Sequence, residues 1–184
     1  PKLLHPLAGK PVIEWTVSSA ALSSARGIVL VAPESLIGEF RCAAERAAGD
    51  KVIAVVSGGK TRTESVRAGI AALSSVAGED DIVEIHDGAR PLTSPTLFDR
   101  CAEAALEFEA AIAAVPVIDT IKVVDGCFIE STPDRRKLWA AQTPQAFRYG
   151  LIKLALSNKE NFTDDAAAVE ASGKKVYIVE GKPD

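Results

Sequence analysis

Short aliphatic and β-branched runs recur along the chain, and longer segments of helical pattern separate the early ones. The runs do not alternate strictly between apolar and polar positions, which is typical of strands buried on both faces. They cover residues 27–32, 51–56, 81–85, 111–117 and 175–179. The helical segments cover residues 36–48, 63–73 and 95–108. This order predicts an α/β fold, with a mainly parallel sheet that carries helices on both faces.

One segment, residues 119–144, interrupts this alternation. It contains a strand-like run at 120–124, a turn-like Asp125-Gly126 pair and a second extended run at 127–130, which together predict a β-hairpin. We expect the segment to project as an arm. A two-stranded ribbon is marginally stable alone, so a second copy of the chain is a natural surface for the arm to pack against.

Length and charge narrow the class of protein. A chain of 184 residues with 47% hydrophobic residues can bury one sizeable core, so we expect a single domain over residues 1–184. The formal net charge of -4 provides no overall positive field to attract DNA or RNA. Phosphate chemistry would then depend on a few local cations and backbone N–H groups, which suits a small nucleotide.

The cysteines and the hydropathy indicate a cytoplasmic protein. Cys42, Cys101 and Cys127 are far apart and odd in number, which favours a reducing compartment over a disulfide framework. With His5 and His86 as the two histidines, no zinc cluster is predicted. No apolar run approaches the roughly 20 residues that a membrane helix needs, and we expect no membrane partner.

Polar and glycine-rich segments follow two of the predicted strands. Residues 57–66 place Gly58 and Gly59 before a helix, where a ligand can approach the backbone, although a plain turn with a Thr61/Glu64 capping box explains them equally well. Asp87 follows the next strand, where a carboxylate could hold Mg²⁺ against a triphosphate; an Asp-Gly turn with Arg90 as ion-pair partner is the alternative.

Two later segments also carry polar groups. Residues 141–147 place hydrogen-bonding side chains around Pro144, as a stiff loop that presents them to a ligand or as an ordinary structured loop. Residues 162–166 precede a helix that runs to about Ser172. Their plainest interpretation is an N-cap at Thr163, with acids that complement the helix dipole.

Taken in order, these segments resemble the 2-C-methyl-D-erythritol 4-phosphate cytidylyltransferase family. The resemblance covers essentially the whole chain through PKLLHPLAGKPVIEW, SGGKTRTESVRAG, HDGARPL, PVIDTIKVVDG, PDRRKLWAAQTPQAF, NFTDDAAAVE and VEG. It implies a Rossmann-like, three-layer nucleotidyltransferase fold, a homodimer clasped by the arm, and a site for CTP with Mg²⁺ or another divalent cation. The family also has a glycine-rich loop just before the Pro-Lys pair and an Asn-x-Lys segment after the final VEG, and we expect both to lie outside this chain.

The resemblance also implies roles for particular residues. Lys2 would contact the triphosphate, and Asp87 would face the metal. Gly59 and Ser65 would read the cytosine, and Thr143 would lie between the two substrates. The sugar phosphate, 2-C-methyl-D-erythritol 4-phosphate, would be bound by Arg90 and Thr163, together with Thr120 and Arg135 of the other subunit's arm. The catalytic residues implied are Lys2, Asp87 and Arg135.

Two positions depart from the family pattern, and other functions remain open. Lys60 stands where an acid is frequent, which could alter nucleotide contacts, and Gly88 stands where alanine is usual. A ribitol 5-phosphate cytidylyltransferase would share the fold and the CTP site, although the arm segments favour methylerythritol phosphate. A non-catalytic nucleotide-binding module is a second alternative. A Rossmann dehydrogenase is disfavoured, because no GxGxxG follows a strand.

Overall fold

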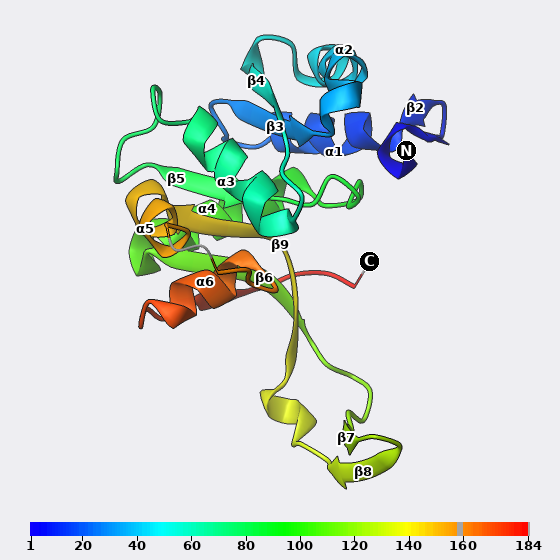
Figure 1. Cartoon of the computed structure of the whole chain (residues 1–184), viewed down its shortest axis with the longest axis vertical. Coiled ribbons are helices and arrows are strands. Elements are labelled where there is room, and N and C mark those ends of the chain that lie inside the picture. Colours follow the sequence, from blue (N-terminus) through cyan, green and yellow to red (C-terminus); the bar gives the residue numbers. More distant parts are fainter. Residues whose placement is uncertain (158–159, 184) are drawn as a thin grey trace.

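The protein consists of a layered α/β body and a long arm that projects from it, as Figure 1 shows. The structure is a computed structural model that describes residues 1–157 and 160–183. The body strands are β3 (Ile28–Ala32), β4 (Val52–Ser57), β5 (Ile82–Ile85), β6 (Ala110–Pro116), β9 (Trp139–Arg148) and β10 (Tyr177–Glu180). The helices are α1 (Val12–Ala21), α2 (Ile37–Ala48), α3 (Arg62–Ala72), α4 (Pro95–Phe108), α5 (Tyr149–Ala155) and α6 (Asp165–Ala171).

The strands form a four-stranded sheet and a neighbouring pair. The sheet has the order β10-β6-β9-β5, and β3 pairs with β4. Pairing is parallel for β10 with β6 and for β3 with β4, whereas β9 runs antiparallel to both of its neighbours. The strands β5, β6 and β10 therefore share one direction. The predicted α/β class is confirmed, and the sheet is mixed because of the single reversed strand β9.

Helices cover both faces of these sheets. One face of the four-stranded sheet packs against α4 through Leu97 and Cys101, and the other packs against α5 and α6 through Ile152 and Val169. Alternate residues of β6 belong to the two clusters, and its first five residues are all buried. The pair β3–β4 lies between α2 and α3. This is the three-layer arrangement, and it explains why the strands read as uninterrupted apolar runs.

Strand β9 is the main correction to the sequence analysis, which treated residues 141–147 as a loop. Residues 142–147 are buried, and Gln145 pairs with Ile112 on one side and Ile85 on the other. Proline normally argues against a central strand because it has no N–H to donate. Here the ladder with β6 is irregular between Ile112 and Ala114, opposite Pro144, and this local interruption accommodates the proline.

Two helices, α1 and α5, were not predicted. Helix α1 is rich in valine, isoleucine, threonine and serine, which have modest helix propensity, so its local signal is weak. It is stabilised by packing instead, since Ile13 and Val17 are buried against the β3–β4 layer. The helices predicted at 36–48, 63–73 and 95–108 match α2, α3 and α4 to within a residue.

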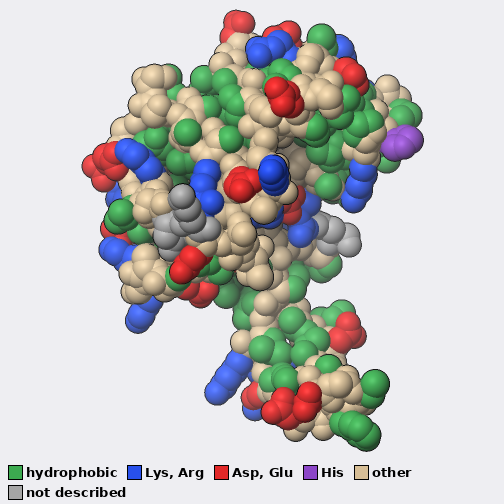
Figure 2. Space-filling view, viewed as in Figure 1, with side chains coloured by type: hydrophobic (Ala, Val, Ile, Leu, Met, Phe, Trp, Pro, Cys, Tyr) green, Lys and Arg blue, Asp and Glu red, His purple; other side chains and the backbone are tan. Residues whose placement is uncertain are grey.

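The arm is the hairpin that the sequence predicted. It contains β7 (Val123–Asp125) and β8 (Phe128–Ser131), which pair antiparallel around Gly126, a residue with φ of 56°. The ends of β6 and β9 form its stem, and Val117 N–H donates to the Leu138 carbonyl at 3.0 Å. Hydrophobic side chains are exposed along the arm, as Figure 2 shows. They are Ile118, Ile121, Val123, Val124, Phe128, Ile129 and Trp139.

Substitution Ile152→Ala should lower the free energy of unfolding by about 2–5 kcal/mol, because Ile152 is fully buried in the α5–α6 layer. Urea unfolding followed by circular dichroism measures the change. Leu154 lies on the same helix but is 70% exposed, so Leu154→Ala should change stability by no more than about 0.5 kcal/mol. Equal losses in the two variants would contradict the layer assignment.

Candidate active site

Asp87 lies just past the carboxyl end of β5, where the chain turns toward α4. Its backbone N–H donates to Thr143 Oγ1 of β9 at 3.2 Å, and its carbonyl accepts from Arg90 N–H at 3.1 Å. Its carboxylate is 45% exposed and lies 3.5 Å from Arg90 Nε. The turn with an Asp–Arg ion pair is therefore confirmed, and the role of the exposed acid in holding Mg²⁺ stays a prediction.

Lys2 shares a cleft with these two residues. The cleft has a volume of about 540 Å³, and its lining includes Lys2, Asp87 and Arg90. Lys2 begins a short 3-10 helix, Lys2–Leu4, and is exposed. Two cations and one carboxylate around a single open cleft form a site that can neutralise phosphate groups and hold a divalent ion.

The glycine loop between β4 and α3 is held by its own hydrogen bonds. Thr61 caps α3 in a capping box with Glu64, as the local pattern predicted. Glu64 Oε2 also accepts from Lys60 N–H at 2.6 Å. Ser65 Oγ accepts from Gly59 N–H at 3.1 Å and donates to the Thr61 carbonyl at 3.0 Å. The loop thus has a fixed shape, and Gly59 is exposed on it.

The segment before α6 lies against the start of α3. The Thr61 hydroxyl donates to Asn161 Oδ1 at 3.3 Å, and Phe162 N–H donates to Thr63 Oγ1 at 3.3 Å. These contacts bring together two regions that are about a hundred residues apart in the sequence. The end of the glycine loop and the residues just before Thr163 consequently lie side by side.

The predicted helix cap at Thr163 is wrong by one residue. Asp164 is the N-cap of α6, and its Oδ1 accepts from Ala167 N–H at 2.9 Å. A carboxylate and a hydroxyl at this position can both accept from a helix N–H, but only the carboxylate carries the negative charge that complements the helix dipole. Thr163 is exposed beside the cap, so its side chain faces solvent rather than the helix end.

Arg62 and Asp165 form a pair that the sequence analysis did not identify. Arg62 Nη2 lies 2.7 Å from Asp165 Oδ2, and the Asp165 side chain is 2% exposed. Burial raises the pKa of the Asp165 carboxyl, and the guanidinium opposes this shift. The pKa of Arg62 is raised: burial lowers it, but the carboxylates of Asp165 and Asp87 outweigh that effect. The sequence signal that could have indicated this pair is the position of Arg62 in the first turn of α3, directly after the cap residue Thr61.

Gln145 was noticed in the sequence as a polar side chain, but its role comes from the fold. It is 2% exposed on β9. Its Oε1 accepts from the N–H groups of Asp165 and Ala166, both at 3.1 Å, and its Nε2 donates to Asp164 Oδ2 at 3.1 Å. Gln145 therefore fixes the start of α6 on the sheet.

Two predicted site residues, Thr120 and Arg135, lie on the arm rather than with the others. Both are exposed, and Arg135 Nη1 donates to the Ile118 carbonyl at 2.7 Å within the arm. Figure 1 shows the arm directed away from the body that carries β5. Within one chain the structure thus groups Lys2, Gly59, Ser65, Asp87, Arg90, Thr143 and Thr163 on the body and leaves the arm pair apart. Thr143 is 5% exposed, with its hydroxyl on Asp87.

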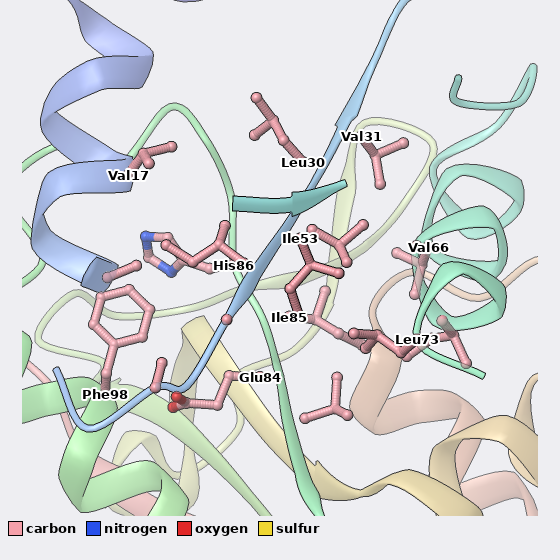
Figure 3. A pocket seen from close by; sticks show the side chains of 18 of the residues that line it. Val17, Leu30, Val31, Ile53, Val66, Leu73, Glu84, Ile85, His86 and Phe98 are labelled. Carbon is pink, nitrogen blue, oxygen red and sulfur yellow. The ribbon is translucent and has the colours of Figure 1, made fainter. Parts of the chain in front are cut away.

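A larger cavity of about 850 Å³ lies beside this site and is mostly apolar. Side chains from α1, β3, α3 and β5 surround it, among them Val17, Leu30 and Val66 (Figure 3). Asp87 and Ser65 border it, and the two arginines in its lining, Arg26 and Arg62, are paired with Asp81 and Asp165. Because charge neutralisation needs cations and polar groups, we assign the chemistry to the smaller cleft around Lys2 and not to this cavity.

Neither a multidentate metal site nor a membrane span is found in the described part of the chain. Residues 1–157 and 160–183 contain no group of three or more His, Cys, Asp or Glu side chains that could hold a metal ion. A cation at Asp87 would take its other ligands from phosphates and water. Over the same ranges, every helix is too short or too polar to cross a membrane.

Comparison with known proteins gives one consistent family. The family model described as 2-C-methyl-D-erythritol 4-phosphate cytidylyltransferase matches residues 1–184. An enzyme of that name from Microcystis aeruginosa is 44% identical over 187 residues, covering 98% of this chain and 81% of its own. A crystal structure of the enzyme of that name from Francisella tularensis superposes with a TM-score of 0.84 at 28% identity, covering 99% of this chain and 84% of its own.

The partly buried Glu84 on β5 should make stability depend on pH. Burial raises the pKa of its carboxyl to about 8, with a further contribution from Asp99, and in the described part of the chain Oε1 has no hydrogen-bond partner. From pH 4.5 to about 8 the folded state keeps a proton that the unfolded state has released, so the free energy of unfolding falls as pH rises. Glu84→Gln should flatten this fall in thermal melts, whereas Glu107→Gln, at an exposed site, should leave it unchanged.

Proposed function

The chain belongs to the 2-C-methyl-D-erythritol 4-phosphate cytidylyltransferase family, and we propose that the cleft around Lys2, Asp87 and Arg90 is its reaction site. The protein is a cytidylyltransferase. It transfers the cytidylyl group of CTP to 2-C-methyl-D-erythritol 4-phosphate and releases pyrophosphate, in non-mevalonate isoprenoid biosynthesis. The observation that carries the site assignment is the convergence of two cations and a carboxylate at the end of β5.

The reaction needs charge neutralisation rather than a general base. The nucleophile is an oxygen of the substrate phosphate, whose second pKa of about 6 leaves it largely dianionic at neutral pH. This oxygen forms a bond to the α-phosphorus of CTP while the bond to the bridging oxygen of the leaving pyrophosphate breaks. Negative charge crowds around the α-phosphorus in this transition state, and Lys2 would stabilise it.

The nucleotide would bind along the glycine loop. Gly59 is exposed on a loop whose shape is fixed by the capping box, so the cytosine can contact the backbone without a prior rearrangement. The Ser65 hydroxyl holds this loop through Gly59 N–H. Lys60, which lies between Gly59 and the cap residue Thr61, would add a positive charge near the nucleotide.

We assign a divalent cation, Mg²⁺ in the simplest case, to Asp87. The residues present fit such an ion: one half-exposed carboxylate faces an open cleft, and Mg²⁺ commonly uses one or two carboxylates together with substrate phosphates and water. When bound, the ion would neutralise charge on the triphosphate. Thr143 would hold Asp87 in place through its backbone N–H.

The sugar phosphate would bind between Arg90 and Thr163, with Thr143 between the two substrates and with Thr120 and Arg135 supplied by the arm of a second subunit. The exposed apolar side chains of the arm support a homodimer, because isolated ribbons rarely expose such a surface to water. The direction of the arm, away from its own body, supports an action in trans. We also propose a cytoplasmic location, which the three unbridged cysteines favour.

The unchanged protein should release pyrophosphate from CTP with 2-C-methyl-D-erythritol 4-phosphate and not with ribitol 5-phosphate. Asp87→Asn and Lys2→Ala should each lower kcat about a hundredfold or more, because each removes a charge at the reacting phosphates. Circular dichroism checks that the fold is kept. Asp50→Asn, at an exposed position outside the cleft, is the control and should retain full activity. Release with ribitol 5-phosphate alone would move the protein to the sister activity.

Mixing two inactive variants should restore activity if the arm acts in trans. Asp87→Asn damages the body site and Arg135→Ala damages the arm, so a mixed dimer keeps one site in which both residues are intact. Randomly re-paired subunits should therefore show about a quarter of the wild-type rate. Light scattering should report a dimer for both variants. A monomer, or a mixture as inactive as its components, would contradict the proposal.

A further inference from the structure

The start of α6 is fixed from two sides by buried polar contacts. On the side of the sheet, Gln145 Oε1 accepts from the N–H groups of Asp165 and Ala166. On the side of α3, Arg62 Nη2 donates to Asp165 Oδ2 at 2.7 Å. Because the Asp165 carboxylate is almost fully buried, removing the guanidinium would leave this buried charge without its ion-pair partner. Asp165 is therefore the point through which α3 and the sheet hold this end of α6.

The exposed Thr163, a predicted sugar-phosphate contact, lies two residues before this point. Its position depends on the chain from Phe162 to Asp165, which is held to α3 at one end by Thr63 and at the other by Arg62. A shift of this short segment displaces Thr163 directly. Displacements of about 1 Å in a positioned group can cost about a hundredfold in rate.

The nucleotide loop, in contrast, does not depend on Arg62. The capping box between Thr61 and Glu64 and the hydrogen bond from Gly59 N–H to Ser65 Oγ lie within the loop and the first turn of α3. None of these contacts uses the Arg62 side chain. Loss of the guanidinium should therefore loosen the Thr163 segment and leave the glycine loop in place.

We propose that Arg62, through Asp165, is a positioning residue that holds the Thr163 segment for the sugar-phosphate substrate and leaves CTP binding unaffected. The inference rests on the proposed function, because it takes Thr163 as a sugar-phosphate contact. It assigns to Arg62 a role in the affinity for one of two substrates without any contact with that substrate. A purely structural ion pair would instead change stability and the fraction of active protein.

Arg62→Met should raise KM for 2-C-methyl-D-erythritol 4-phosphate roughly tenfold and change KM for CTP less than about twofold. Arg62→Lys keeps the charge but not the planar fork, so it should give an intermediate KM. Asp165→Asn keeps the side-chain volume and removes the charge, and it should raise the same KM. This variant tests the inference independently if Arg62→Met folds poorly.

Arg148→Met is the matched control. Arg148 also pairs with an acid, Asp80, and donates to the Leu106 carbonyl, but it lies beside Ile82, at the end of β5 opposite to Asp87. It should lower stability and leave both KM values unchanged. Hydrogen exchange supplies a readout other than activity: in Arg62→Met, peptides that cover residues 161–167 should exchange faster, and those that cover residues 52–60 should not.

The outcomes separate this inference from the function beneath it. A selective rise in KM for the sugar phosphate together with local exchange supports the role of Arg62. Equal rises for both substrates, or lost stability with both KM values unchanged, would overturn it while the function stands. No pyrophosphate release by the unchanged protein would overturn the proposed function and this inference together.

Discussion

Strand β9 hydrogen-bonds to β5 along one edge and to β6 along the other, and the functional parts of the molecule depend on this insertion. Its first residues leave the body as one side of the arm, and its middle residues reach the end of β5. There Thr143 accepts from the Asp87 backbone, and two residues later Gln145 holds the start of α6. A single strand thus sets the distances between the arm, the acid at the end of β5 and the start of α6.

Electrostatics in this site are local. The chain carries a net charge of -4, so the binding of two polyanionic substrates relies on a few well-placed cations. Lys2 and Arg90 lie at the cleft, where they can meet phosphate groups. Arg62 is paired instead with the buried carboxylate of Asp165, so we expect its charge to serve the protein rather than the ligand. Basic side chains within one small region would therefore have two distinct roles, contact with phosphate groups and an ion pair inside the protein.

Over the described ranges of the chain, the arm has no packing surface on its own body. Its strands β7 and β8 pair with each other, and no helix covers them in the described part of the chain. A ribbon with exposed isoleucine, valine and phenylalanine gains stability when it packs on another surface. If that surface is a twin body, the packing that stabilises the arm also brings Arg135 to the reacting phosphate. Assembly and catalysis would then depend on the same contact.

The sequence by itself determined the α/β class, five of the six body strands, the helices α2, α3, α4 and α6, the arm and the acid at the end of β5. These features depend on local patterns: apolar runs, helical periodicity, an Asp-Gly turn and a capping box. The tertiary structure alone decided that residues 139–148 form a strand, because Pro144 hides that strand from any local pattern. It also decided the pairing of Arg62 with Asp165, about a hundred residues apart, and the contact of Gln145 with the start of α6, about twenty residues away. Such distant partners leave no periodic signal in the sequence, because they meet only through the packing of β9, α3 and α6.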